Sequence, residues 1–289
     1  MRSLKSALVA VGLLAAALVA PLAPPTPAAP ASAVTADACG ARLLRSTGGY
    51  WNCTFVDNFS GTSLDRTKWL GLDQYGAGNM CVLNNARTVG VAYGVLRISA
   101  VRAQGTSTPC PVRADGTRGT YAGATVSTYG RWSQQYGRLE ARIRVRDTSL
   151  PGLHEAFWLW PDVRYGADGP WPASGEIDVM ETYSVRPSIS VPFLHYSADS
   201  LGPVDGFNTS WSCRSQRGLW HTYVLEWTAS RVAISVDGQT CLVSTDAAPS
   251  FRKRMIVSLT QYIGHGDNAY DGRISLPATT EVDWVKAWQ

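Results

Sequence analysis

From Arg138 to Arg146, charged and apolar side chains alternate without interruption. Period two is the repeat of a β-strand, so this segment predicts a strand with one buried and one polar face. The same period recurs in three further segments, 96–100, 223–227 and 232–236. The last of these ends at Asp237-Gly238, a pair typical of a type I′ hairpin turn, which leads into a strand over 241–243. No segment holds a 3.6-residue period over three helical turns.

Short strands joined by turns are also what the composition favours, since the 289 residues include 27 glycines and 16 prolines. Charged residues make up 17% of the chain, and no long polar low-complexity tract occurs, which excludes disordered and coiled-coil classes. Because no break in composition separates two halves, we expect a single all-β sandwich. The net charge of +4 is too small for a typical polyanion-binding protein, so no nucleic acid partner is expected.

Residues 1–33 predict a secretory signal peptide. Arg2 and Lys5 precede an apolar run, and the segment closes on Ala31-Ser-Ala33. A membrane anchor is the competing interpretation, but prolines interrupt the run and no second apolar stretch of about 20 residues exists. We therefore expect a secreted, extracellular protein that has no membrane contact after cleavage, with a tether over 34–50 and one domain over 51–289.

The six cysteines are even in number, and none forms a C-x-x-C pair. In an exported chain this pattern favours three disulfides over a metal cluster. Fifteen pairings are possible, and the sequence does not choose among them. Three glycosylation sequons begin at Asn52, Asn58 and Asn208, and their use depends on the host.

Three acidic residues occupy six positions in the segment 174–183. In a flat strand Glu176 and Asp178 share one face and Glu181 points to the other. A β-bulge between Asp178 and Glu181 would bring all three carboxylates to one face. Two Glu carboxyl groups can then approach to about 5–5.5 Å, the separation used in retaining glycoside hydrolysis.

Such a cluster is electrostatically costly, because one carboxyl must hold a proton near neutral pH. The ionised partner can attack an anomeric carbon while the protonated partner supplies a proton to the departing oxygen. The alternative is an exposed strand whose acidic residues only solvate one face. The flanking apolar residues and the preceding Trp171 favour the catalytic interpretation.

At these residues the chain resembles glycoside hydrolase family 16, laminarinase-type, whose signature is E-[ILV]-D-x-x-E. Further segments resemble the family in the family's order: 57–65 with Trp69, 136–143, 156–159, 171–178, 194–196, 221–227 and 282–285. The resemblance implies a jelly-roll sandwich of two curved antiparallel sheets with an open concave substrate cleft. It also implies Glu176 as nucleophile, Glu181 as general acid/base and Asp178 as the residue that tunes their protonation.

The resemblance further implies substrate-binding residues. Trp158 and Trp171 occupy positions that wall the sugar next to the cleaved bond, and His195 lies on the neighbouring strand, where a backbone-bonded structural histidine is the alternative. Gln261 is a candidate hydrogen-bond partner of the sugar. Trp132, Trp160 and Trp211 are looser candidates for the cleft. The remaining tryptophans of this group are assigned to the core: Trp69, Trp220, Trp227, Trp284 and Trp288.

Many members of the family carry a structural calcium ion, and the matching positions are Asn58, Gly94 and Asp283. Asn58 replaces the usual Glu, which reduces the charge that attracts a hard cation. Neither Cys/His spacing for a catalytic metal nor a nucleotide-binding motif is present, so no cofactor is expected to be required.

Three departures from the family pattern fall in the substrate subsites. His154-Glu-Ala156 replaces W-P-A, Thr88 lies near the position of an asparagine, and Gly264-His-Gly266 replaces a G-G pair. Because linkage preference comes from such contacts, the departures bear on the substrate rather than on the reaction.

The sequence thus predicts a secreted, monomeric, retaining endo-β-glycanase that acts by double displacement through a covalent glycosyl-enzyme. The expected substrate is β-1,3-glucan or mixed-linkage β-1,3-1,4-glucan. The alternatives are a transglycosylase, a hydrolase of another β-glycan such as galactan or xyloglucan, and a non-catalytic glycan-binding protein. A binding protein has no reason to keep three costly acids together.

Overall fold

A computed structural model of the chain describes residues 36–75, 79–166 and 169–289. The segment with uninterrupted alternation forms strand β10 (Gly137–Arg144). Leu139, Ala141 and Ile143 are buried on one face of β10, as the period predicts. The other predicted segments lie within β8, β14, β15 and β16, and Asp237-Gly238 forms the predicted turn with positive φ at both residues. The predicted signal peptide lies outside the described residues.

Sixteen of the described strands form one large sheet in which nearly all pairs are antiparallel, and the first two described strands form a separate two-stranded sheet. The order of the large sheet is β13-β12-β11-β17-β9-β8-β18-β10-β14-β15-β16, β3 pairs with β18, and β6 pairs with β9 in parallel. The strands are β1 (Ala36–Asp37), β2 (Gly40–Ala41), β3 (Cys53–Asp57), β4 (Leu70–Gly71), β5 (Gln74–Tyr75), β6 (Met80–Val82), β7 (Val89–Ala92), β8 (Val95–Arg102), β9 (Tyr121–Ser127), β10, β11 (Leu153–Pro161), β12 (Glu176–Tyr183), β13 (Val191–His195), β14 (His221–Trp227), β15 (Val232–Val236), β16 (Gln239–Ser244), β17 (Met255–Ile263) and β18 (Ala278–Trp288).

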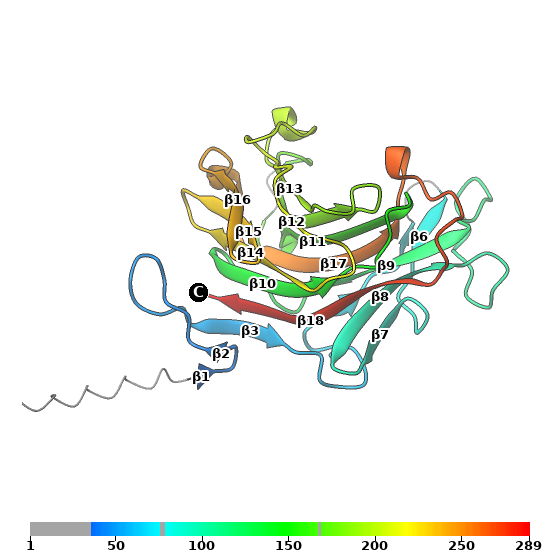
Figure 1. The fold of residues 1–289 in the computed structure, drawn as a ribbon, viewed down its shortest axis with the longest axis horizontal. Coiled ribbons are helices and arrows are strands. Elements are labelled where there is room, and N and C mark those ends of the chain that lie inside the picture. The colour runs from blue at the N-terminus through cyan, green and yellow to red at the C-terminus, as the bar shows by residue number, and fades with distance from the viewer. Residues whose placement is uncertain (1–35, 76–78, 167–168) are drawn as a thin grey trace, which may run out of the picture. The chain divides into compact units, whose positions relative to one another are not determined.

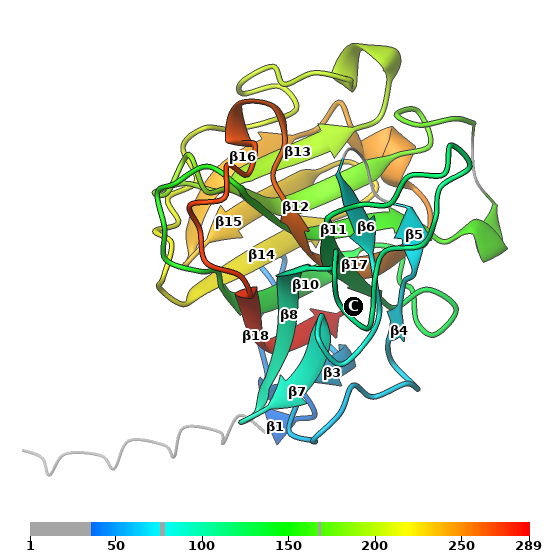
Figure 2. The same ribbon diagram turned by 90° about the vertical axis from the view of Figure 1, so that its right-hand side faces the viewer.

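The sheet folds into two layers. Figure 1 shows β11, β12, β13 and β17 in one layer, above β10, β18 and β3 in the other. The side view in Figure 2 shows β8 beside β18, and β7 pairs with the other side of β8. One large apolar cluster fills the space between the layers and takes residues from both. The all-β sandwich predicted from period two is confirmed.

Helical structure within the described ranges is confined to four one-turn 3-10 helices, all in loops. In those ranges, no helix has the length and apolar character needed to cross a membrane. The four are η1 (Val163–Tyr165), η2 (Ala198–Ser200), η3 (Ala248–Phe251) and η4 (Gly266–Asn268).

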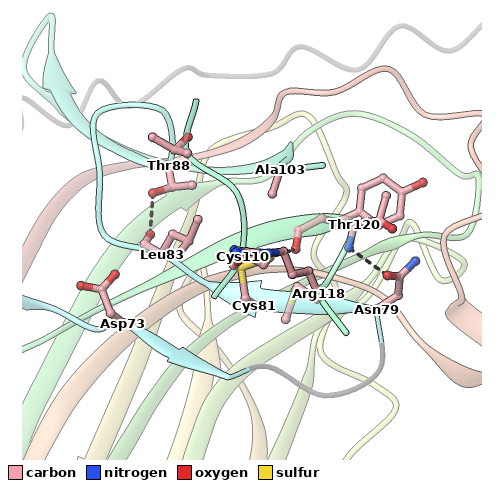
Figure 3. Close-up of a disulfide and its surroundings, with 12 residues drawn as sticks. Asp73, Asn79, Cys81, Leu83, Thr88, Ala103, Cys110, Arg118 and Thr120 are labelled. Atoms are coloured by element: carbon pink, nitrogen blue, oxygen red, sulfur yellow. Dashed lines mark hydrogen bonds between the residues drawn. A yellow bond between two sulfur atoms is a disulfide. The ribbon is translucent and has the colours of Figure 1, made fainter. Parts of the chain in front are cut away.

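The six cysteines form the three disulfides that their number predicted. The pairs are Cys39–Cys53, Cys81–Cys110 and Cys213–Cys241. Figure 3 shows the second pair, which joins β6 to the long loop that follows β8. The Arg118 guanidinium donates to the Cys110 carbonyl oxygen and the Thr120 amide donates to Asn79 beside this disulfide. The disulfide therefore fastens a loop with little regular structure to the sheet.

The segment predicted as a tether has structure of its own from Ala36 onward. Strands β1 and β2 form a short hairpin, and the Cys39–Cys53 disulfide joins that hairpin to β3. Of the sequons, Asn208 is fully buried and its side chain bonds backbone groups of Val204 and Gly202, so the structure gives an oligosaccharide no room there.

Two of the tryptophans assigned to the core lie elsewhere. Trp69, Trp227 and Trp288 are fully buried, as predicted. Trp220 and Trp284 are instead only partly buried, and long cationic side chains cover their rings. The cations are Arg142 and Arg144 over Trp220 and Lys286 over Trp284. An indole ring under a cation is stabilised without full burial, which explains the wrong assignment.

Candidate active site

Strand β12 contains the bulge that the acidic segment predicted. Trp158 of β11 pairs with Asp178 and Phe157 pairs with Met180, so Val179 is the extra residue, and the register with β13 also shifts between Asp178 and Glu181. Ile177, Val179 and Met180 are fully buried. The bulge therefore turns Glu181 to the face that already carries Glu176 and Asp178.

Asp178 lies between the two glutamates and is almost fully buried. Burial raises its pKa well above the ordinary range, and the charges of Glu176 and Glu181 raise it further. A protonated Asp178 lowers the repulsion in the cluster, because three ionised carboxylates this close are unfavourable. That Asp178 tunes the protonation of the two glutamates stays a prediction.

His195 faces Asp178 from β13. Its Nε2 atom is 3.5 Å from Asp178 Oδ2, and its Nδ1 atom is 2.9 Å from the Ser200 carbonyl oxygen. Burial lowers the pKa of His195, which favours a neutral ring that donates from Nδ1 to the carbonyl. His195 is thus tied to the backbone beside the cluster, as its structural alternative proposed, and its ring contacts Trp171.

Trp171 reaches the cluster from the loop before β12. Its indole nitrogen donates to Glu176 Oε2 at 2.7 Å, and the side chain is 42% exposed. Burial raises the pKa of Glu176 to about 7, the Trp171 hydrogen bond lowers it, and the charge of Glu181 raises it. Trp171 therefore stabilises the ionised form of Glu176 and presents an open aromatic face next to it.

Glu181 has a different set of neighbours. Nε2 of His154 on β11 lies 2.9 Å from Glu181 Oε1, and Tyr183 is the next residue on the same face of β12. Burial raises the pKa of Glu181, but the hydrogen bond and charge of His154 outweigh it, so the net effect is a lowered pKa. The two glutamates are therefore held in unlike environments.

Among the other sugar-binding candidates, Trp158 lies on the same face as the acids and Gln261 does not. Trp158 pairs with Asp178 across the strands and donates from its indole nitrogen to Thr260 Oγ1 at 2.9 Å. Gln261 is fully buried, and its amide bonds Thr280 and the Tyr262 carbonyl oxygen, so its assignment to the cleft is wrong. Strand parity explains the error, because Thr260 and Tyr262 on either side of Gln261 face the acids instead.

A cavity of about 340 Å³ has Glu181, but not Glu176, among its lining residues. Its lining includes Tyr183, Phe193 and Trp211, and Trp211 is stacked under the Arg186 guanidinium. The looser candidate Trp211 thus lies on this surface, while Trp132 does not, because it packs on Phe55 against the core. Trp160 lies beside Trp158 on β11.

Sequence reasoning recorded His154 and Glu155 only as departures from a pattern. In the structure both side chains form polar contacts, on opposite faces of β11. His154 contacts Glu181, whereas Glu155 is fully buried and forms a two-pronged ion pair with Arg217 at 2.7 and 2.8 Å. The sequence did contain a signal for His154. It lies four residues before Trp158, and residues an even number apart on a strand point to the same face.

The three expected calcium positions do not fit a calcium ion. Asp283 supplies the single carboxylate of the set, and it is paired with the Arg142 guanidinium. Asn58 is neutral and exposed, and Gly94 lies in the turn between β7 and β8. Calcium prefers several oxygen ligands with negative charge, and a guanidinium at the only carboxylate of the three positions opposes its binding.

Thr88, the residue near the expected asparagine of the early cleft strand, is buried, and its hydroxyl donates to the Leu83 carbonyl oxygen.

Carboxylates gathered on one face of a β sandwich, with tryptophans beside them, fit the site of a glycoside hydrolase. The profile of glycosyl hydrolases family 16 matches residues 79–286. The chain belongs to this family.

Two curated relatives are a beta-glucanase of Rhodothermus marinus, 31% identical over 65% of this chain, and glucan endo-1,3-beta-glucosidase A1 of Niallia circulans, 27% identical over 82% of it. The chain spans 63% and 38% of the lengths of these two proteins. Among solved structures, the endo-beta-1,3-glucanase from Pyrococcus furiosus is 19% identical with a TM-score of 0.70, covering 86% of this chain and 97% of that one. That likeness concerns the fold, which is the jelly roll that the family resemblance implied.

Proposed function

We propose that the protein is a secreted retaining endo-β-glycanase whose reacting groups are Glu176 and Glu181, with Asp178 between them. The observation that carries the proposal is the bulge at Val179, which gathers three acids on one face at an electrostatic cost. A fold has no need of such a cluster, and double displacement uses it directly.

In the first step, Glu176 attacks the anomeric carbon and forms an ester bond to it while the glycosidic C–O bond breaks. Glu181 gives a proton to the departing oxygen, so the leaving sugar departs as a neutral alcohol. The Trp171 hydrogen bond supports this role, because it favours the ionised form of Glu176.

In the second step, Glu181 removes a proton from water, and the water oxygen attacks the same carbon. The ester bond to Glu176 breaks, and the configuration at the anomeric carbon is the same as at the start. Asp178 holds its own proton throughout and keeps the charge on the strand low.

The proposed substrate is β-1,3-glucan or mixed-linkage β-1,3-1,4-glucan. The names of the relatives from Rhodothermus marinus and Niallia circulans support this class. Trp158 and Trp171 offer flat apolar surfaces beside the acids, on which sugar rings can stack. We further propose that the protein acts as a monomer outside the cell. The three disulfides support an oxidising compartment, and the pattern of residues 1–33 supports export.

The test is a screen of the purified protein against laminarin, lichenan, xyloglucan, agarose and carrageenan, with product sizes recorded. We expect oligosaccharides of intermediate size from laminarin or lichenan, and NMR of the first products should show the β anomer. The Glu176→Gln variant is the control for contaminating activity. An α anomer in the first products contradicts the mechanism, and binding without turnover of any glycan makes the protein a glycan-binding member of the fold.

A further inference from the structure

We propose that His154 is a positioning residue for Glu181 and that the two side chains hold one transferable proton between them. The proposal rests on the proposed function, because it assigns the source of the proton that Glu181 gives to the leaving oxygen. His154 Nε2 lies 2.9 Å from Glu181 Oε1, and both side chains are mostly buried, at 17% and 14% exposure.

The imidazole of His154 is held in place on two sides. Tyr183 stacks on it with the ring centroids 4.8 Å apart and the planes 5° from parallel. Tyr262 of β17 meets it edge-on at 6.4 Å. Because His154 pairs with both tyrosine positions across the strands, the backbone register itself aims Nε2 at Glu181.

The charges around His154 favour a proton on the pair. The titratable groups that face it or its partner come from three strands: Glu176, Asp178, Glu181 and Tyr183 of β12, His195 of β13, and Tyr262 of β17. Glu155 acts on His154 by its charge from the opposite face of β11. Arg186, His265 and Asp267 line the cavity that also includes Glu181. Burial lowers the pKa of His154, but the hydrogen bond and charge of Glu181 raise it above the ordinary value. Glu155 adds little free charge, since Arg217 neutralises it.

With one proton, the pair is either imidazolium with carboxylate or imidazole with carboxylic acid. When the glycosidic bond breaks, Glu181 gives its proton to the departing oxygen and His154 is left neutral. When water attacks in the second step, the proton released by water returns to the pair. No further reactant is needed, and His154 never has to touch the sugar.

This arrangement separates two requirements that a lone carboxyl must meet at once. Glu181 must be protonated in the first step and ionised in the second, at one working pH. A second basic group at 2.9 Å keeps the proton within reach of Glu181 while the carboxylate is formed. The structure therefore predicts that loss of the last proton from the pair sets the alkaline limb of activity.

The experiment compares the wild-type protein with His154→Gln, which keeps a hydrogen-bonding side chain and removes the titration. His221→Gln is the matched control, because His221 is paired with Asp237 at 2.6 Å on the other layer, away from the acids. Two substrates are used: laminarin, and a 2,4-dinitrophenyl β-laminaribioside whose leaving group departs without a proton. The quantity followed is kcat/KM against pH, since it covers the steps up to departure of the leaving group.

For His154→Gln we expect about 10- to 100-fold lower kcat/KM on laminarin, a change of less than about threefold on the activated glycoside, and an alkaline limb at lower pH. His221→Gln should match the wild type in kcat/KM on both substrates and in the pH of the alkaline limb. Equal losses on both substrates with an unmoved pH profile make His154 a merely structural residue and overturn the proposal, as does an unchanged rate on laminarin.

A second measurement does not depend on activity. Titration of the imidazole nitrogens by NMR should show a pKa of His154 above the ordinary value in the wild type and a lower one in Glu181→Gln. An identical pKa of His154 in both proteins overturns the proton-sharing pair. If the wild type hydrolyses no glycan, the proposed function fails, and this titration still decides the inference.

Discussion

The indole nitrogen of Trp171 donates a 2.7 Å hydrogen bond to Oε2 of Glu176. One side chain therefore supplies both an aromatic surface and a stabilising contact for ionised Glu176, the proposed nucleophile. Trp171→Phe keeps much of the flat surface and removes the donor. We expect the acid limb of the kcat/KM profile to move to higher pH and kcat/KM at pH 6 to fall about tenfold, since hydrogen bonds to charged groups contribute about 1.5–3 kcal/mol. Trp160→Phe is the control. Equal profiles of kcat/KM against pH for the two variants would show that the Trp171 hydrogen bond does not affect activity.

Activity should depend on pH through Glu176. Its pKa of about 7 means that the carboxylate is protonated, and unable to attack, as the pH falls below neutrality. We expect kcat/KM on laminarin to drop about tenfold for each pH unit below that pKa. A rate that is flat from pH 5 to pH 8 contradicts the assignment.

The same shift makes Glu176 a cost to stability at high pH. A carboxyl whose folded pKa lies above its unfolded value of 4.5 favours the folded state below pH 4.5, and that contribution is lost as pH rises through about 7. Glu176→Gln should therefore raise the free energy of unfolding by about 1–3 kcal/mol at pH 8 and leave it nearly unchanged at pH 4. Urea denaturation at both pH values measures this, and the variant should lose at least about 10³-fold in turnover. A variant less stable than the wild type at pH 8 argues against the raised pKa.

Loss of one charge from the buried ion pair of Glu155 and Arg217 should strongly destabilise the protein. Glu155→Gln leaves a guanidinium without its counter-charge in the core and should cost about 3–5 kcal/mol. Asp271→Asn at the exposed Arg273 pair is the comparison, expected to cost less than about 1 kcal/mol. Thermal unfolding of the two variants gives the answer, and similar melting temperatures would show that Glu155 does not carry a buried charge.

Calcium should not stabilise this protein, because Arg142 is paired with the one carboxylate of the expected site. A specific ion at 100 times its dissociation constant adds about 2.7 kcal/mol to the free energy of unfolding. We expect melting temperatures in excess EDTA and in millimolar CaCl₂ to agree within about 1 °C. Arg142→Ala is the informative variant, because a gain of calcium dependence there would show that the guanidinium is what excludes the ion.

Much of the fold and the acidic cluster was accessible from the sequence. Alternation predicted β10, the Asp237-Gly238 turn and the strands around it, because side-chain direction in a strand follows residue parity alone. The bulge was predictable for the same reason, since only an extra residue lets Glu181 join Glu176 and Asp178.

Other features depended on which strands pair and in what register. Gln261 faces the core and Tyr262 the acids, and no local pattern distinguishes the two faces of β17, a strand buried along most of its length. Trp220 lies under Arg142 and Arg144 of β10, a strand distant from it in the sequence. The disulfide pairing was likewise open among fifteen choices until the fold brought the cysteines together.

Residues 176–181 by themselves determined the three acids, their spacing and the strand that carries them. Side chains on one strand keep the same relative directions in any fold that contains the strand. The partner of each acid was decided by tertiary structure. His154 meets Glu181 across 27 residues of sequence, through a register that the packing of the sandwich sets. Proton affinity depends on such neighbours at hydrogen-bonding distance, so the sequence could predict a carboxylate site while the fold decided how its protons are shared.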